Sequence, residues 1–297
     1  MNAHQFYYEA EPQHIQLADA SIAVRTYGSG PPLALIHGFF VYGYTWRHVL
    51  PELANHFTCY VVDLPGFGES VYTRQTDFTF TAQARRLTRL FGILGISEGL
   101  HLMAHDTGAS IARMAALDKH TQVNKLVLIN TEIPNHRPPF IPMYQVLARL
   151  PMANLAFRSL LKLDFVVRSP MMLNQFFYDK SRLMDKRNWG HYVKPLLRSH
   201  SMYGMLEYLK GIEWDVVDAF QHQHGDITAD TLLVWGEEDK TFPIALARDM
   251  MKQFQGNCSM EAIKNTCIMP HEERPREVLE AVLRFLEAKN APVYRAS

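Results

Sequence analysis

The sequence predicts an α/β fold with a mostly parallel central sheet, helices on both faces of that sheet, and an inserted helical cap. Three observations support this prediction. Short apolar runs alternate with amphipathic stretches through residues 1–132. Residues 133–222 are rich in methionine, leucine and aromatic side chains and show no convincing strand pattern. The alternation of strand and helix then resumes and continues to a last amphipathic helix.

The first part of the chain contains several apolar runs of strand length. Residues 21–27 alternate apolar and polar side chains, as half-buried strands do. Continuous apolar runs, which are typical of buried parallel strands, follow at 32–36, 58–63, 100–103 and 125–130. Amphipathic stretches predict helices over 80–94 and 107–117.

The last part repeats the pattern of the first. Residues 231–235 and 260–263 are predicted strands, and a helix is expected from about 244. The final helix shows one apolar face at Val278, Leu279, Val282, Phe285 and Leu286. We therefore expect one core domain formed by 1–132 and 223–297, interrupted by a helical cap at 133–222. Two domains in tandem fit less well, because the last strands would then lack a sheet.

Composition gives no positive argument for several classes of function. Thirty basic and thirty acidic residues leave no net charge, which gives no argument for a nucleic acid or an anionic membrane as partner. The three cysteines, Cys59, Cys258 and Cys267, have no CxxC spacing and predict neither a disulfide framework nor a zinc site. No signal peptide, membrane span or metal-spaced histidine cluster is visible. We expect a cytoplasmic protein with reduced thiols and no metal or cofactor.

One segment has the pattern of a catalytic turn. In LHLMAHDTGASIARMAAL, Asp106 lies between an apolar strand and an amphipathic helix, with Ala104 and Gly108 two residues to either side. Small residues at this spacing are typical of a nucleophile elbow, because the strained turn brings neighbouring backbone close to the nucleophile. Alone, an aspartate at a helix start is more often an ordinary N-cap, and the context has to decide.

Three further motifs occur in a consistent order around this turn. They are ALIHGFF at 34–40, DLPGFGES at 63–70 and WGEEDKTFP at 235–243. Together with the elbow they resemble the α/β-hydrolase fold superfamily. The aspartate in an HDxG setting resembles the branch that contains epoxide hydrolases, haloalkane dehalogenases and fluoroacetate dehalogenases.

The resemblance implies a two-step hydrolysis of a small apolar organic substrate. The Asp106 carboxylate attacks an electrophilic carbon and forms an ester with the enzyme. A histidine oriented by an acid then activates water to hydrolyse the ester. The resemblance also implies that the backbone N–H groups of Phe39 and Thr107 form the oxyanion hole.

Some positions depart from the patterns of these enzymes. Haloalkane dehalogenases typically carry tryptophan where this chain has Thr107, and asparagine where it has Phe39. Epoxide hydrolases tend to have proline at the position of Phe40, and they use cap tyrosines to protonate the epoxide oxygen. The predicted cap offers Tyr144, Tyr178, Tyr192, Tyr203 and Tyr208, none of which the sequence assigns to this role.

The most serious departure is at the catalytic histidine. Relatives carry Gly-His-x-x-x-x-Glu-x-Pro before the last helix, and counting back from Glu273 and Pro275 places Cys267 and Ile268 at the Gly-His pair. Ile268 therefore stands at the position of a lost histidine. Either a shift of the loop lets His271 act as the base, or the usual base is absent, and we favour its absence.

Two acids are candidates for the third member of the triad. Asp239 matches the usual position, and Glu132 matches an alternative position used by some dehalogenases.

The first functional hypothesis is a hydrolase that acts through Asp106 on an epoxide, haloalkyl or ester-like substrate. The alternative is a non-hydrolytic descendant, which would be a ligand-binding protein or a lyase or proton-transfer enzyme. The sequence leaves the substrate and the oligomeric state open.

Overall fold

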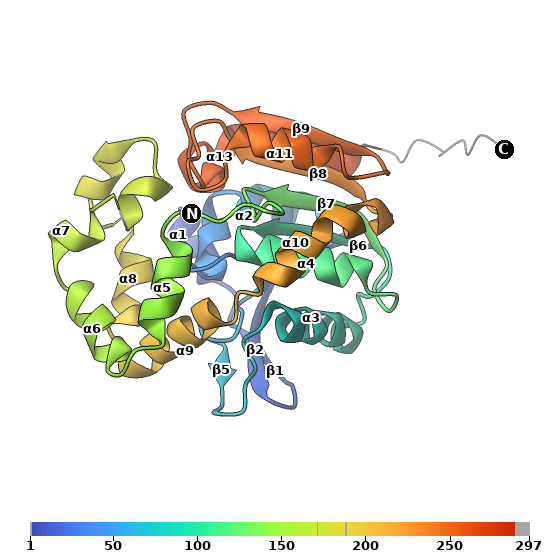
Figure 1. The fold of residues 1–297 in the computed structure, drawn as a ribbon. Coiled ribbons are helices and arrows are strands. Elements are labelled where there is room, and N and C mark those ends of the chain that lie inside the picture. Colours follow the sequence, from blue (N-terminus) through green and yellow to red (C-terminus); the bar gives the residue numbers. More distant parts are fainter. Residues whose placement is uncertain (1, 171, 188, 289–297) are drawn as a thin grey trace.

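The central feature of the fold is one large sheet (Figure 1). The structure is a computed structural model that describes residues 2–170, 172–187 and 189–288. Among these residues nine strands pair in the order β1-β2-β4-β3-β6-β7-β8-β9, with β5 beside β2. The strands are β1 Gln13–Gln16, β2 Ala20–Tyr27, β3 Pro32–Ile36, β4 Thr58–Val62, β5 Val71–Tyr72, β6 Leu100–His105, β7 Val123–Ile129, β8 Asp230–Gly236 and β9 Cys258–Ile263.

The strand directions bring the motif loops to one edge of the sheet. Strands β3, β4 and β6–β9 are parallel, whereas β1 and β5 run antiparallel to β2, and β2 runs antiparallel to β4. The carboxyl ends of parallel strands meet at one edge, where open α/β sheets bind their ligands. The loops after β3, β6, β7 and β8 carry Phe39, Asp106, Glu132 and Asp239, so this edge gathers the predicted site residues.

Helices lie on both sides of the sheet, with α3 packed beside α4 and α2 beside α13 (Figure 1). The first helical elements are α1 Ala3–Tyr7, the 3₁₀ turn η1 Gly43–His48, α2 Leu50–His56, α3 Phe80–Leu94 and α4 Thr107–Leu117. The last ones are α11 Ile244–Met251, α12 Pro270–Glu273 and α13 Pro275–Glu287.

The predicted fold class is confirmed, and the predicted elements agree closely with the structure. Helices α3 and α4 and strand β3 have the predicted bounds, and the other predicted strands differ from the observed ones by one or two residues at their ends. Strands β1 and β5 were not predicted. Strand β1 has the sequence QHIQ with one buried side chain, and β5 has two residues, so neither offers a pattern long enough to detect.

The segment between β7 and β8 is helical. No strand occurs in the described part of 133–222, which we call the helical insertion. Figure 1 shows α5–α8 gathered at one end of the molecule, beyond the end of the sheet. The elements of this segment are α5 Ile141–Ala148, α6 Ala153–Leu160, α7 Asp164–Val167, η2 Leu173–Phe176, η3 Lys180–Met184, α8 Gly190–Leu196, α9 Ser199–Lys210 and α10 Trp214–Gln223. Within the described ranges, no helix is both long and apolar enough to cross a bilayer.

A buried ion pair ties the helical insertion to the core. Both Glu272 carboxylate oxygens accept hydrogen bonds from the Arg47 guanidinium at 2.7 Å. The hydroxyl of Tyr192, on α8, donates to the same carboxylate. Burial by itself would raise the pKa of Glu272, but the charge and hydrogen bonds of Arg47 hold that pKa below its ordinary value. The pair therefore joins η1, α12 and the insertion in one contact.

We predict that Glu272→Gln lowers the free energy of unfolding by about 3–5 kcal/mol, because it leaves the buried Arg47 charge without its partner. Urea denaturation measures the effect. The matched control is Glu261→Gln, which removes the exposed pair with Arg284 and is expected to change the free energy by about 1 kcal/mol or less. Equal effects of the two substitutions would contradict the anchoring role of Glu272.

Candidate active site

Asp106 occupies a strained turn between β6 and α4. Its backbone angles are φ 52° and ψ −132°, a conformation that non-glycine residues rarely adopt and that costs about 1–3 kcal/mol. The Asp106 N–H lies 3.0 Å from the carbonyl oxygens of both Ile129 and Asn130 at the end of β7. The Thr131 hydroxyl donates to the Asp106 carbonyl at 3.0 Å. The end of the neighbouring strand therefore holds the turn in place.

Two glycines are required by close backbone approach at this turn. A Cβ atom at Gly108 would lie 2.1 Å from the His37 carbonyl oxygen, and one at Gly38 would lie 2.5 Å from the Cβ of Asp106. Both distances are shorter than any real contact of a Cβ atom. The glycines thus let the loop after β3 and the start of α4 close around Asp106.

The Asp106 carboxylate is held by backbone donors. The Phe39 N–H donates to Asp106 Oδ2 at 2.8 Å, and the Thr107 N–H also donates to this carboxylate. The structure thus brings the two sequence-predicted oxyanion residues to the same side chain. Backbone N–H groups placed this way stabilise negative charge without reorganising during a reaction.

A second carboxyl group lies close to Asp106. The hydroxyl of Thr131, which donates to the Asp106 carbonyl, lies 3.1 Å from Glu132 Oε2, and Ser110 donates to the same oxygen at 2.7 Å. Burial raises the pKa of Asp106 well above its ordinary value, and the Glu132 charge raises it further. Burial likewise raises the pKa of Glu132, against the hydrogen bond from Ser110. The two carboxyls therefore titrate as a pair.

Both carboxyls line a cavity of about 90 Å³ between the sheet edge and the helical insertion. The polar part of the lining includes Asp106, Glu132, Thr107 and Thr241, and most of the remainder is apolar. The insertion contributes Ile141, Tyr144, Phe157, Leu161, Met205, Leu209 and Trp214 to the wall, among others. A few polar groups in an apolar cavity are typical of a site for a small organic ligand.

Ile268, which the sequence predicts to be the position of a lost histidine, also lines this cavity. It is buried, and its carbonyl oxygen lies 2.9 Å from His105 Nε2. An aliphatic side chain accepts no proton from water. The structure therefore brings Ile268 to the same cavity as Asp106 and offers no basic group at that position.

Asp239 lies behind the cavity wall. Its Oδ2 accepts a hydrogen bond from Asn130 Nδ2 at 2.7 Å, and its Oδ1 accepts one from the Thr241 N–H at 2.8 Å. Burial raises the pKa of Asp239 to about 7, against these hydrogen bonds. Both Asp239 carboxylate oxygens thus accept a hydrogen bond, one from Asn130 and one from Thr241. No imidazole is among their hydrogen-bond partners in the described residues.

His271 is not brought to the cavity. It is fully buried in α12, its Nε2 lies 2.8 Å from the Thr45 hydroxyl, and its ring packs against Trp46 and His105. Burial lowers the pKa of His271 to about 3, so it is neutral at physiological pH. This placement leaves His271 outside the lining of the cavity, and the absence of the usual base stays a prediction.

The five tyrosines that the sequence left unassigned lie in different surroundings. Tyr144 lines the cavity. Tyr208 donates its hydroxyl hydrogen to the Thr107 side chain at 3.0 Å, and Tyr192 binds Glu272. Tyr178 and Tyr203 are exposed. Of these five tyrosines, Tyr144 is the one that lines the cavity, and its hydroxyl lies 4.0 Å from Met172 Sδ.

Sequence reasoning missed Arg113, which lies beneath the carboxyl pair. Its guanidinium donates to the Ser110 hydroxyl at 2.7 Å and to the Glu132 carbonyl at 2.9 Å, and it stacks on Phe220. The residue is fully buried, and its positive charge offsets that of Glu132. Its spacing of three residues from Ser110 on α4 is common in helices, so the pattern carried no distinguishing signal.

In the described ranges, no group of three His, Cys, Asp or Glu residues is arranged to hold a metal ion.

Comparison with known proteins gives one family and several distant relatives. The family model described as alpha/beta hydrolase fold matches residues 31–275. Epoxide hydrolase 3 of Xenopus tropicalis is 26% identical over 294 residues, which cover 94% of this chain and 79% of that protein.

Two solved structures are similar at the level of the fold. An alpha/beta hydrolase fold protein from Burkholderia ambifaria has a TM-score of 0.76 and 20% identity, covering 92% of this chain and 99% of the other. The epoxide hydrolase CorEH also has a TM-score of 0.76 and 20% identity, covering 93% and 99%.

We predict that Asp106→Asn raises the free energy of unfolding at pH 8 by about 1–2 kcal/mol. Because the pKa of Asp106 is higher in the folded than in the unfolded state, its ionisation destabilises the fold as the pH rises above about 4. The difference between the variant and the parent should therefore grow from pH 4 to pH 8 in urea titrations. The exposed Asp226→Asn serves as control, and a variant less stable than the parent at pH 8 would contradict the argument.

Proposed function

The chain belongs to the alpha/beta hydrolase fold family, and from this premise we propose that Asp106 is the nucleophile of an epoxide hydrolase-like or dehalogenase-like enzyme. The observation that carries the proposal is the Asp106 carboxylate itself. It lies on a strained turn, faces an apolar cavity and accepts hydrogen bonds from two backbone N–H groups. The epoxide hydrolases among the similar proteins support this choice of chemistry.

The first step is a displacement at carbon. One Asp106 carboxylate oxygen forms a bond to an electrophilic carbon, and the carbon–halogen bond or one carbon–oxygen bond of an epoxide breaks. Halide leaves as an anion, or the epoxide oxygen takes a proton. Tyr144 lines the cavity and is the proposed donor of that proton. The product is an ester whose carbonyl oxygen accepts hydrogen bonds from the Phe39 and Thr107 N–H groups.

The second step lacks its usual base. Hydrolysis of the ester requires a group that removes a proton from the attacking water, and in this proposal Ile268, which lines the cavity, stands where relatives carry that group. A general base contributes about 10²–10⁴ to such a rate. Glu132 is the remaining carboxyl at the cavity to accept the proton, whereas Asp239 has no imidazole to orient. We therefore propose that the ester forms but that its hydrolysis is slow.

The helical insertion acts in this proposal as a cap. Its methionine, leucine and aromatic side chains form one wall of the cavity, which favours a small apolar organic substrate over a charged one.

The three cysteines form no disulfide, which is consistent with a reducing compartment such as the cytoplasm.

A second candidate function rests on the carboxyl pair. Burial raises the pKa values of both Asp106 and Glu132 in this apolar cavity, so one of them can hold a proton while the other is ionised. Such a pair can remove a proton from one atom of a ligand and return it to another. This arrangement favours proton transfer or elimination as the alternative to hydrolysis, and it needs no histidine.

Incubation with a panel of epoxides and haloalkanes, followed by intact-mass analysis, tests the first step. We expect a persistent adduct at Asp106, which adds the mass of the whole epoxide or, after loss of halide from a haloalkane, the mass of the alkyl group less one hydrogen. Asp106→Asn is the control and should form no adduct, because its amide is not a nucleophile. Absence of any adduct or turnover, together with exchange of solvent deuterium into a ligand, would favour the proton-transfer function instead.

Substitution of Ile268 tests the second step. We predict that Ile268→His increases the decay rate of the ester by about 10²–10⁴, because it returns a base to the cavity that Asp106 lines. Ile268→Leu keeps an aliphatic side chain and should leave the decay unchanged. The measurement is the disappearance of the adduct over time. Equal decay in all three proteins would contradict the assignment of Ile268 to the histidine position.

A further inference from the structure

The exposed apolar side chains of this protein are concentrated on the helical insertion. Of the sixteen large hydrophobic side chains exposed in the described part of the chain, eleven lie between residues 143 and 184. Scattered exposed hydrophobics are normal, but a concentration on one part of a surface marks an interaction site. We define the outer apolar face as Met143, Val146, Leu147, Leu150, Met152, Leu155, Leu160, Leu163 and Phe165.

Helix α5 is mostly apolar on both of its sides, with Gln145 as the polar residue on its buried side. Ile141 and Tyr144 point into the cavity. On the other side, Met143, Val146 and Leu147 are exposed, and Leu150 continues their helical spacing just beyond the helix end. A helix that is apolar all round is normally buried. The exposed side of α5 therefore has the composition of a contact surface.

The next helices repeat this arrangement. Phe157 and Leu161 line the cavity from the end of α6. Leu155 and Leu160 of the same segment are exposed, and Phe165 on α7 is 75% exposed. A phenylalanine side chain that is three-quarters in water is unfavourable unless something covers it, because burial of such a ring is worth about 1.5–3 kcal/mol.

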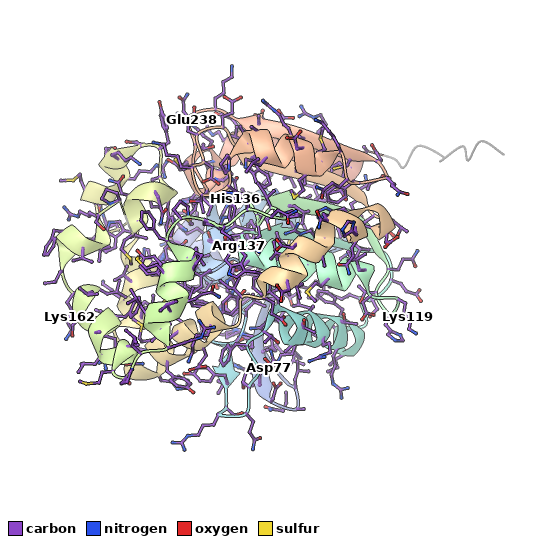
Figure 2. The ribbon with its side chains drawn as sticks, in the orientation of Figure 1. Asp77, Lys119, His136, Arg137, Lys162 and Glu238 are labelled. Atoms are coloured by element: carbon purple, nitrogen blue, oxygen red, sulfur yellow. The ribbon has the colours of Figure 1, made fainter. Side chains whose placement is uncertain are left out.

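The same segment is strongly basic in a chain of zero net charge. Residues 141–187 contain eight lysines and arginines against three aspartates. Arg149 and Lys162 are exposed between the apolar residues, and Figure 2 shows Lys162 at the outer edge of the insertion. Apolar side chains interspersed with basic ones are typical of segments that lie in the interface of a membrane with anionic lipids.

We propose that the outer apolar face docks onto an anionic lipid surface. Phe165, Met152 and their neighbours insert among the acyl chains, and Arg149 and Lys162 contact the lipid headgroups. A second copy of the chain fits this face less well, because a two-fold interface would bring two basic surfaces together. This inference goes beyond the proposed chemistry and does not depend on reaction at Asp106.

Docking in this orientation would place the cavity next to the bilayer. Helices α5 and α6 would contact lipid on one side and the cavity on the other, so an apolar substrate dissolved in the membrane would have only this layer to cross. The helical insertion would then serve as the route by which apolar molecules enter from the membrane.

Co-sedimentation of the full chain with vesicles tests the proposal. We expect binding to vesicles of phosphatidylcholine mixed with phosphatidylglycerol, weak binding to phosphatidylcholine alone, and a decrease with added salt. The double substitution Val146→Glu and Leu150→Glu should weaken binding about tenfold or more. Its control is Ile93→Glu, because Ile93 is 51% exposed on α3, away from the insertion.

A charge exchange gives a second, independent comparison. Lys162→Glu should weaken binding to the anionic vesicles, whereas Lys119→Glu should not, because Lys119 lies at the opposite edge of the molecule (Figure 2). Binding that is equal in all variants, or no binding to anionic vesicles, would overturn the proposal. It would also be overturned if light scattering shows a dimer that Val146→Glu and Leu150→Glu convert to a monomer.

Discussion

The conformation of one residue determines how this site is built. Asp106 adopts a backbone conformation that its side chain disfavours, and it does so because its N–H lies against two carbonyl groups at the end of β7. That contact exists only while β6 and β7 pair in their observed register. The turn also needs Gly38 and Gly108, since a Cβ atom at either would collide with neighbouring atoms. Sheet register, the glycine positions and the direction of the carboxylate are thus consequences of the same constraint.

The charge balance around Asp106 follows from this arrangement. Three buried carboxyls, those of Asp106, Glu132 and Asp239, lie near the same sheet edge, and burial raises the pKa of each. Backbone N–H groups, hydroxyls, the Asn130 amide and the buried Arg113 guanidinium supply the compensation. In relatives of the kind that the motifs resemble, an imidazole would be a further compensating group. Here Ile268 adds apolar surface instead, so the carboxyls remain costly to ionise.

The sequence predicts those features that a short stretch of residues determines, and it does not predict contacts between residues that are far apart in the chain. The motifs around Phe39, Asp106 and Asp239 each follow a strand end, and strand ends have a strong local pattern, so the fold and the sheet edge could be predicted. The position of the lost histidine is predicted at Ile268 because Glu273 and Pro275 provide a fixed count, and it stays a prediction. Arg113 and the Arg47–Glu272 pair could not be predicted, because their contacts join residues that are far apart in the sequence or that share an unremarkable helix spacing. The basic, apolar character of 141–187 was hidden in whole-chain totals, which cancel to zero.

The aliphatic side chain of Ile268 would limit how many substrate molecules each copy of the protein can consume. Under the proposed chemistry, a protein whose ester is hydrolysed slowly reacts about once per copy within the lifetime of that ester. Its capacity then depends on how many copies are present rather than on how long they work. Such a protein would behave as a stoichiometric scavenger of reactive electrophiles, and its modified fraction would record past exposure to them.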